Sequence, residues 1–171
     1  MKLSTRARYG LRMMIELARE LRTNELVHLG RISEITGLSN NYLSQLAISL
    51  KNANLIKGVS GKKGGYRLAK PVDKISVAEI VQTVIGPINI TDCVNDPNIC
   101  KNSTFCETRA VWTIINSRIQ QTLEELSLSD MIDRDWLSKI KQEHSDIPLL
   151  FPDQITSPVN DGFQPGCPTS Y

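Results

Sequence analysis

The chain has 171 residues and a formal net charge of +2, and 40% of its residues are hydrophobic and 22% charged. This composition is ordinary for a soluble globular protein with one domain and an appendage, or with two small domains. Neither a signal peptide nor a membrane span of ~18 apolar residues occurs, so we expect a cytoplasmic protein with reduced thiols.

The charge is distributed unevenly along the chain. Residues 1–70 contain thirteen basic and four acidic side chains, whereas residues 71–171 contain seven basic and fourteen acidic ones. A basic first segment favours a polyanionic partner for that segment alone. A merely solvated basic surface is the alternative explanation.

The first predicted element is a helix that begins at Ser4 or Thr5 and ends near Leu21. Apolar residues recur along one side of it at helical spacing, as expected for a helix packed on a core. These residues are Leu11, Met14, Ile15, Ala18 and Leu21.

Two further helices form a predicted helix-turn-helix. The first begins at Leu29 and stops at Gly37, and the second is capped by Ser39. A helix, a tight turn with a glycine and a capped second helix are typical of this DNA-binding motif. The second helix carries Leu43, Leu46 and Leu50 at helical spacing.

A basic hairpin follows the helix-turn-helix. Two β-like runs, 55–60 and 65–69, flank the sequence Gly61-Lys-Lys-Gly. Glycines let such a turn adopt positive φ, and the lysines then project from its tip. We therefore predict a winged helix-turn-helix DNA-binding domain over residues 1–72, with Tyr66 packing the wing onto the body.

Polar side chains at the start of the recognition helix are the candidates for reading DNA bases. Asn and Gln can pair bidentately with adenine, and Ser tolerates several bases. Tyr42 either reaches a phosphate or packs inward. The candidates are Ser39, Asn40, Asn41, Tyr42, Ser44 and Gln45.

Basic residues and the wing tip are the candidates for phosphate contacts, which give affinity without sequence preference. Each of these charges taken alone is equally consistent with solvated surface. The set comprises Gly61, Lys62, Lys63, Arg6, Arg8, Arg31 and Lys51.

Residues 73–143 are predicted to be helices around a cysteine loop. Ser76 and Glu79 form a predicted capping box, and the helix they open ends at Gly86. A longer helix from about Cys106 carries a seam that is expected to form a two-fold dimer contact, with core packing as the alternative. The seam residues are Val111, Ile115, Ile119, Thr122 and Leu126.

The remaining elements are less marked in the sequence. Trp112 lies in an apolar helical stretch and is assigned to the core. Ser129 is predicted to cap a last helix that ends near Glu143. Residues 144–171 hold five of the eight prolines without periodicity, and we predict a flexible tail.

Three of the four cysteines, Cys93, Cys100 and Cys106, lie within fourteen residues of one polar loop. Thiolates clustered in this way suit zinc or an iron–sulfur cluster, and they can also act as a redox switch. Chance clustering and a disulfide are the alternatives, and the disulfide does not fit a reducing compartment. Nothing indicates an enzyme: the chain has no Ser/His/Asp set, no phosphate-cradling glycine loop and only two histidines.

Five segments then occur in a recognisable order, namely Met-Lys-Leu-Ser-Thr-Arg-Ala-Arg-Tyr-Gly at the start, Leu38-Ser-Asn-Asn-Tyr-Leu-Ser-Gln-Leu, Ala53-Asn-Leu-Ile, Gly61-Lys-Lys-Gly-Gly-Tyr-Arg-Leu and the cysteine loop. With these segments the chain resembles the IscR/NsrR-type family of bacterial winged-helix regulators over roughly residues 1–143. The resemblance implies a mainly α fold with a small β-hairpin wing and a long dimerisation helix.

The same resemblance implies a function. The expected protein is a homodimeric transcription regulator, a repressor at a palindromic DNA operator. A [2Fe-2S] or [4Fe-4S] cluster on the three cysteines would tune its DNA affinity. Its targets would be genes of iron–sulfur assembly, cysteine metabolism or nitrosative and oxidative stress. A protein-interaction module that docks to a cysteine-biosynthesis enzyme is the rival from another class.

Several positions depart from the family pattern. Arg109 stands where [2Fe-2S] members carry a histidine ligand, and Arg8 stands where [4Fe-4S] members can use an acidic residue from the partner subunit. A guanidinium is a very poor ligand, so the fourth ligand is open. Ser44 and Ser60 replace an acidic residue and a minor-groove arginine of some relatives, which alters the expected DNA sequence preference. The candidates for the fourth ligand are Glu107, Asp92, Asp96, water, a small thiol and, less locally, His28, His144 and Cys167.

Overall fold

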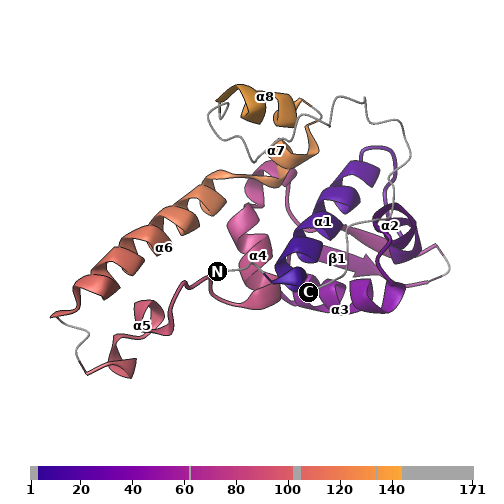
Figure 1. Cartoon of the computed structure of the whole chain (residues 1–171). Helices are drawn as coiled ribbons and strands as arrows, with labels where there is room; N and C mark the ends of the chain where they lie inside the picture. The colour runs from indigo at the N-terminus through magenta and orange to yellow at the C-terminus, as the bar shows by residue number, and fades with distance from the viewer. Residues whose placement is uncertain (1–3, 62, 102–104, 134, 144–171) are drawn as a thin grey trace.

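The computed structural model describes residues 4–61, 63–101, 105–133 and 135–143. These residues form helices around one antiparallel hairpin, and helix α6 reaches away from the rest as an arm (Figure 1). No helix among them combines the length and apolarity needed to cross a membrane. The elements are α1 (Thr5–Glu20), α2 (Leu29–Thr36), α3 (Asn40–Asn52), β1 (Ile56–Val59), β2 (Gly65–Leu68), η1 (Val72–Lys74), α4 (Val77–Ile85), α5 (Asp92–Asn95), η2 (Pro97–Ile99), α6 (Glu107–Glu125), α7 (Leu128–Ile132) and α8 (Trp136–Glu143).

The predicted helix-turn-helix is confirmed, and local capping explains its boundaries. Ser4 caps α1 by accepting a hydrogen bond from the Ala7 amide, and Ser39 caps α3 by accepting one from the Tyr42 amide at 3.3 Å. Gly37 ends α2 in the left-handed conformation at φ 71°, where a glycine carries no Cβ penalty. The turn between α2 and α3 is therefore fixed by local sequence.

The wing is also confirmed. Strand β1 pairs with β2 antiparallel, so that Ile56 faces Leu68 and Val59 faces Gly65. Tyr66 extends this pairing, because its amide donates to the Val27 carbonyl at 2.8 Å and its carbonyl accepts from the Val27 amide at 3.0 Å. The half-buried Tyr66 ring packs against the core, as expected. The wing is thus attached to the segment that precedes α2.

One hydrophobic core joins the winged helix to α4 and α7. Side chains on both sides of residue 72 pack in it, and α1 can approach α4 because Gly10 has no Cβ; one built there would lie 3.0 Å from Val84 Cγ2. Because this core is continuous, the end of α6 that leads into α7 lies against the DNA-binding part of the protein. The largest fully buried side chains are Met13, Met14, Leu17, Ile32, Leu43, Leu46, Leu50, Leu55, Ile56, Ile75, Ile80 and Leu128.

Two predictions about helix starts need correction. Ser76 does cap α4 through the Glu79 amide, but the Glu79 carboxylate bonds to Lys70 instead of returning to Ser76. Ser129 does not cap a single last helix either. Ser127 caps α7, which ends at Ile132, and α8 is separate.

Ser127 and Asp130 form a complete capping box at α7. The Ser127 hydroxyl accepts a hydrogen bond from the Asp130 amide, and the Asp130 carboxylate accepts from the Ser127 amide at 2.9 Å. The Ser127 hydroxyl also donates to this carboxylate and is the largest cause of the lowered pKa of Asp130. Asp130 therefore stabilises the fold most when it is ionised.

The Ser127→Ala variant is expected to lose about 1 kcal/mol of unfolding free energy near pH 7. Because the folded-state pKa of Asp130 is depressed, its contribution is present above the unfolded pKa and is lost as pH falls through the folded pKa. The difference between variant and parent should therefore shrink at about pH 3. Urea unfolding at both pH values checks this, with Ser117→Ala on α6 as the control. An equal difference at both values would contradict the role of the carboxylate.

Candidate nucleic-acid interface and thiol site

The first turns of α3 present the predicted base-reading residues in different ways. Asn40, Asn41 and Gln45 are exposed. The Ser39 hydroxyl is occupied as the helix cap, and the Ser44 hydroxyl donates to the Asn40 carbonyl at 2.8 Å. The exposed amide side chains are therefore better placed than the two serines to contact base edges.

Tyr42 packs inward, which is one of the two alternatives that the sequence left open. Its half-buried ring meets the Tyr9 ring edge-to-face, with centroids 5.9 Å apart and an interplanar angle of 88°. This contact joins α3 to α1. Tyr42 therefore positions the recognition helix.

Not all of the predicted phosphate contacts are equally available. Arg31 forms ion pairs with Glu20 at 2.9 Å and Glu34 at 3.7 Å, and the hydrogen bond to Glu20 raises its pKa further. These exposed ion pairs compete with a phosphate for the guanidinium, and the phosphate contact of Arg31 stays a prediction. The contact between α1 and α2 was not anticipated from the sequence.

The other basic candidates lie on the surface around α3 and the wing. The Arg6 guanidinium donates to Ser49 Oγ at 3.0 Å, and the Arg8 guanidinium lies 5.0 Å from the centre of the Tyr9 ring. Lys51 and Lys63 are exposed, and Gly61 has a φ of 117°, as expected for the wing tip. Lys62 lies outside the described residues.

A polar cleft of about 330 Å³ separates the wing from the start of α2. His28, Lys51 and Tyr66 line it together with the glycine-rich backbone of the hairpin. Because His28 was considered only as a metal ligand, sequence reasoning missed its place beside the wing. The pairing of Val27 with Tyr66 brings these segments together.

The three loop cysteines have different surroundings, and all are free thiols. Cys93 is half-buried in α5, with Sγ 3.3 Å from Thr91 Oγ1, and Cys100 is exposed after η2. Cys106 is the N-cap of α6, where its Sγ accepts a hydrogen bond from the Arg109 amide at 3.4 Å. The loop contains two short helical turns, α5 and η2.

As placed, these thiols do not form a closed metal site. The described residues contain no group of three or more His, Cys, Asp or Glu side chains arranged to hold a metal ion. The donor type suits iron or zinc, but the arrangement does not fit a cluster without movement of the loop. Asp92 and Glu107 are exposed, whereas Asp96 accepts hydrogen bonds from Asn98. The other possible fourth ligands, His144 and Cys167, lie outside the described residues.

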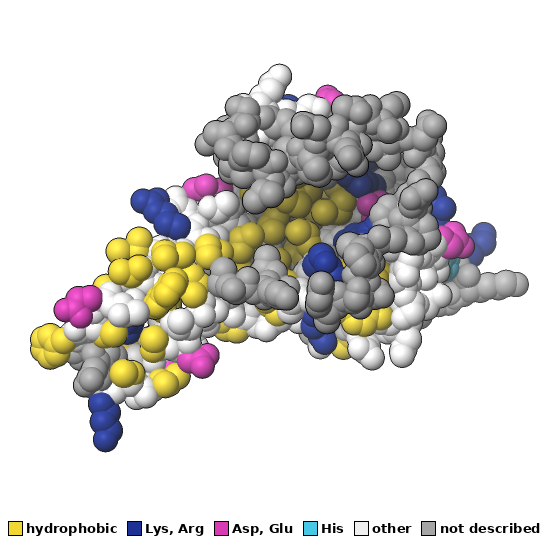
Figure 2. All heavy atoms as spheres, viewed as in Figure 1, with side chains coloured by type: hydrophobic (Ala, Val, Ile, Leu, Met, Phe, Trp, Pro, Cys, Tyr) yellow, Lys and Arg dark blue, Asp and Glu magenta, His cyan; other side chains and the backbone are white. Residues whose placement is uncertain are grey.

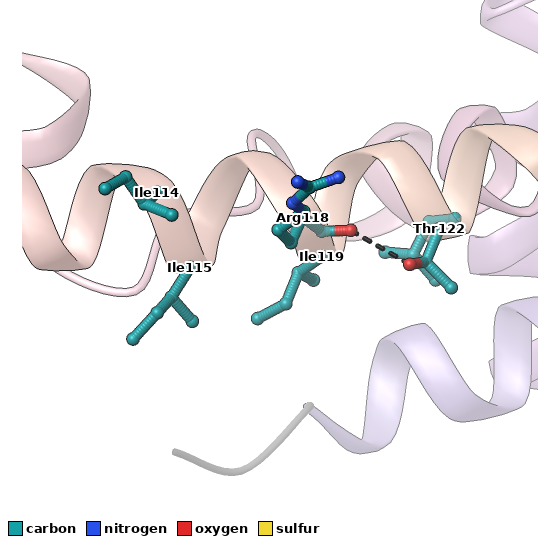
Figure 3. Close-up of a pocket in the computed structure, with 6 residues that line it drawn as sticks. Ile114, Ile115, Arg118, Ile119 and Thr122 are labelled. Atoms are coloured by element: carbon teal, nitrogen blue, oxygen red, sulfur yellow. Dashed lines mark hydrogen bonds between the residues drawn. The ribbon is translucent and has the colours of Figure 1, made fainter.

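The seam of α6 is largely exposed along its outer half. Val111 is 52% exposed and Ile115 39%, and Thr122 is exposed too, while Ile119 and Leu126 pack against a small core that includes Ala7 and Val77. Ile115 and Ile119 lie on the same side of α6, and they line an open cleft of about 390 Å³ with Ile114, Arg118, Thr122 and Leu123 (Figure 3).

Trp112 is not a core residue, contrary to the prediction. It is 37% exposed, and its neighbour Ile114 is 64% exposed. Figure 2 shows hydrophobic side chains gathered over the arm at the left of the view. An apolar helix surface of this kind is typical of a protein–protein contact.

The capped helix-turn-helix, the wing and the basic residues around them define a winged-helix DNA-binding protein of mainly α fold. Residues 3–134 match the Rrf2 family, which is described as an iron-dependent transcriptional regulator. The chain therefore belongs to the Rrf2 family, and the predicted resemblance is confirmed.

Individual relatives support the same class. The regulator IscR of Aliivibrio salmonicida is 35% identical over 132 residues, which cover 77% of each chain. The structure of CymR, the global cysteine regulator of B. subtilis, is similar with a TM-score of 0.63 and 33% identity, over 77% of this chain and 96% of that one. The structure of T. potens IscR has a TM-score of 0.63 and 32% identity, over 77% and 86%. The chain is thus a DNA-binding transcription regulator, and its relatives are not enzymes.

Proposed function

We propose that the protein acts as a homodimer that binds a palindromic operator and represses the genes behind it. The observation that carries the dimer is the exposed apolar surface of α6, which the protein's own core leaves uncovered along Val111, Trp112, Ile114 and Ile115. A two-fold contact between two such arms would present two recognition helices to two half-sites. Residues 1–72 would then read DNA, and residues 73–143 would form the dimer and carry the cysteine loop.

Within this proposal the base-reading residues are exposed polar groups of α3, and the phosphates are held around them. Asn40, Asn41 and Gln45 would contact base edges, with Ser39, Tyr42 and Ser44 shaping the helix that carries them. The wing residues Gly61, Lys62 and Lys63 would follow the backbone together with Arg6, Arg8, Lys51 and, in competition with its ion pairs, Arg31.

We further propose that an iron–sulfur cluster, [2Fe-2S] or [4Fe-4S], on Cys93, Cys100 and Cys106 tunes the DNA affinity. Three free thiols in one short loop and the iron dependence that describes the family support this proposal. Coupling between two sites of roughly 1–3 kcal/mol is enough to switch promoter occupancy. The candidate targets are genes of iron–sulfur assembly, cysteine metabolism or nitrosative and oxidative stress.

Anaerobic reconstitution tests the cluster. The parent protein is expected to develop a visible charge-transfer band and to contain iron with acid-labile sulfide, because thiolates are the usual ligands of such clusters. The triple Cys93→Ser, Cys100→Ser, Cys106→Ser variant should lose both signals. Ser117→Ala, at an exposed position of α6 outside the cysteine loop, is the control and should retain them. A colourless parent protein after reconstitution would show that the cluster proposal is wrong.

A zinc site or a thiol redox switch is the second candidate for the same cysteines. It is favoured by the exposure of Cys100 and by the position of Cys106 at the N-terminus of a 19-residue helix. Thiols at helix N-termini are more reactive than ordinary ones. Metal analysis separates the candidates, since it finds iron with sulfide, zinc, or neither. In the last case, mass spectrometry after mild oxidation would identify the modified thiol.

A further inference from the structure

The inner face of α6 holds the backbone that leads into the cysteine loop. Gln120 Nε2 donates to the Ile88 carbonyl at 3.2 Å, and Asn116 Oδ1 accepts from the Ile90 amide at 3.0 Å. Arg109 Nε donates to the Cys93 carbonyl at 2.8 Å. Steps of four and seven residues place these side chains on one face of a helix. We call the three residues the α6 ladder.

Asn116 indicates that this face is built to bind backbone. It is 4% exposed and is the one buried residue within α6. A buried polar side chain is costly unless it is hydrogen-bonded, and an unpaired backbone amide carries a similar cost. The hydrogen bond between Asn116 and the Ile90 amide satisfies both groups. An apolar residue at position 116 would leave that amide without its acceptor.

Arg109 contacts two of the three loop cysteines. Its amide donates to Cys106 Sγ, and its side chain donates to the Cys93 carbonyl. The guanidinium stays charged and cannot be a metal ligand, but a charged donor makes a stronger hydrogen bond to a carbonyl than a neutral one does. Arg109 is half-buried, so solvent competes only partly for this bond.

We propose that Arg109 is a positioning residue that, as part of the α6 ladder, holds Cys93 against the start of α6. The fixed part of the loop is then the segment from Ile88 to Cys93, which ends at the first thiol. Cys100 lies outside this segment, beyond the last hydrogen bond of the α6 ladder. This inference does not depend on the proposed cluster.

Hydrogen exchange of the reduced, chelator-treated full-length protein tests the proposal. The Ile90 amide donates to Asn116 of α6, and the Val94 and Asp96 amides, just after Cys93, donate to the carbonyls of Thr91 and Asp92. In Arg109→Ala their exchange is expected to become roughly tenfold faster, the effect of losing one charge-assisted hydrogen bond. Arg109→Lys keeps a charged donor and should restore part of the protection.

Arg118→Ala is the matched control. Arg118 is exposed on the same helix, and its guanidinium donates to Gln121 Oε1 at 3.4 Å, with no hydrogen bond to the described part of the loop. Its exchange pattern should equal that of the parent. Unchanged exchange in Arg109→Ala would overturn the proposal, and so would equal acceleration in Arg118→Ala.

Alkylation of the cysteines is a second measurement, and a residue with only a structural role would not change its result. The ratio of Cys93 to Cys100 labelling by iodoacetamide should rise in Arg109→Ala, because Cys93 is half-buried and Cys100 is exposed. Exchange in α1 and α4 should stay unchanged. If those helices also exchange faster, Arg109 acts through overall stability and the proposal is wrong. Loss of the charge-transfer band bears on the cluster alone, so the two proposals fail separately.

Discussion

Ile115→Asp is expected to make the protein monomeric and to weaken its binding to a two-half-site operator by roughly a hundredfold. Ile115 lines the open cleft on α6 beside Ile119, and it is 39% exposed in the single chain (Figure 3). A two-fold contact there would bury the new carboxylate and bring it near its own copy. Burying unpaired like charges in this way costs several kcal/mol, and 1.4 kcal/mol is about tenfold.

Ser117→Asp is the control for this variant. Ser117 is exposed and lies two residues further along α6, about 200° around the helix axis from Ile115. It adds the same charge to a different face and should remain dimeric. Sedimentation equilibrium gives the oligomeric state, and fluorescence anisotropy gives the affinity for duplex DNA. A parent protein that sediments as a monomer would contradict the dimer, as would a dimeric Ile115→Asp.

Gln45→Ala is expected to lower affinity for the operator by about tenfold to a hundredfold while leaving binding to unrelated duplex unchanged. Gln45 is exposed in the second turn of α3, and an amide that pairs with a base edge contributes about 1–3 kcal/mol of discrimination. An operator for this measurement can be selected from random duplexes. Equal losses on operator and unrelated duplex would contradict base reading by Gln45.

Lys63→Ala provides the contrast for Gln45→Ala. Lys63 is exposed on the wing and is expected to hold a phosphate. Its loss should weaken operator and unrelated duplex alike and should reduce the slope of log affinity against log salt by about 1. Titrations at several salt concentrations measure that slope. No change in the slope would remove Lys63 from the phosphate contacts.

Elements with local start and stop signals could be predicted from the sequence. Ser39 caps α3 and Gly37 ends α2 because each acts on groups within a few residues of itself. The choice between Ser127 and Ser129 was different, since either serine can cap a helix. The structure decides it through long-range pairing, in which the Leu128 amide donates to the Ile75 carbonyl and the Val77 amide to the Leu126 carbonyl.

The candidate site was harder to predict because its surroundings also depend on contacts between distant parts of the chain. The sequence does not show that the fold pairs Arg31 with Glu20, and Trp112 looks like a core residue until α6 is seen to leave the body. Spacing identified Cys93, Cys100 and Cys106 as a set. It could not show that α6 holds one of them, because the Arg109 side chain donates to the Cys93 carbonyl across sixteen residues of the chain.

The two hydrogen bonds between Val27 and Tyr66 have a consequence for how this regulator would respond to the proposed signal. They join the wing to the segment that leads into the helix-turn-helix, and we infer that the two move together as one DNA-binding head. In the proposed dimer, a signal from the cysteine loop would then act less on motion within one head than on the angle between the two heads. The DNA affinity would therefore depend on how well that angle matches the spacing of the two half-sites. A change of one base pair in this spacing rotates one half-site by roughly 35° relative to the other.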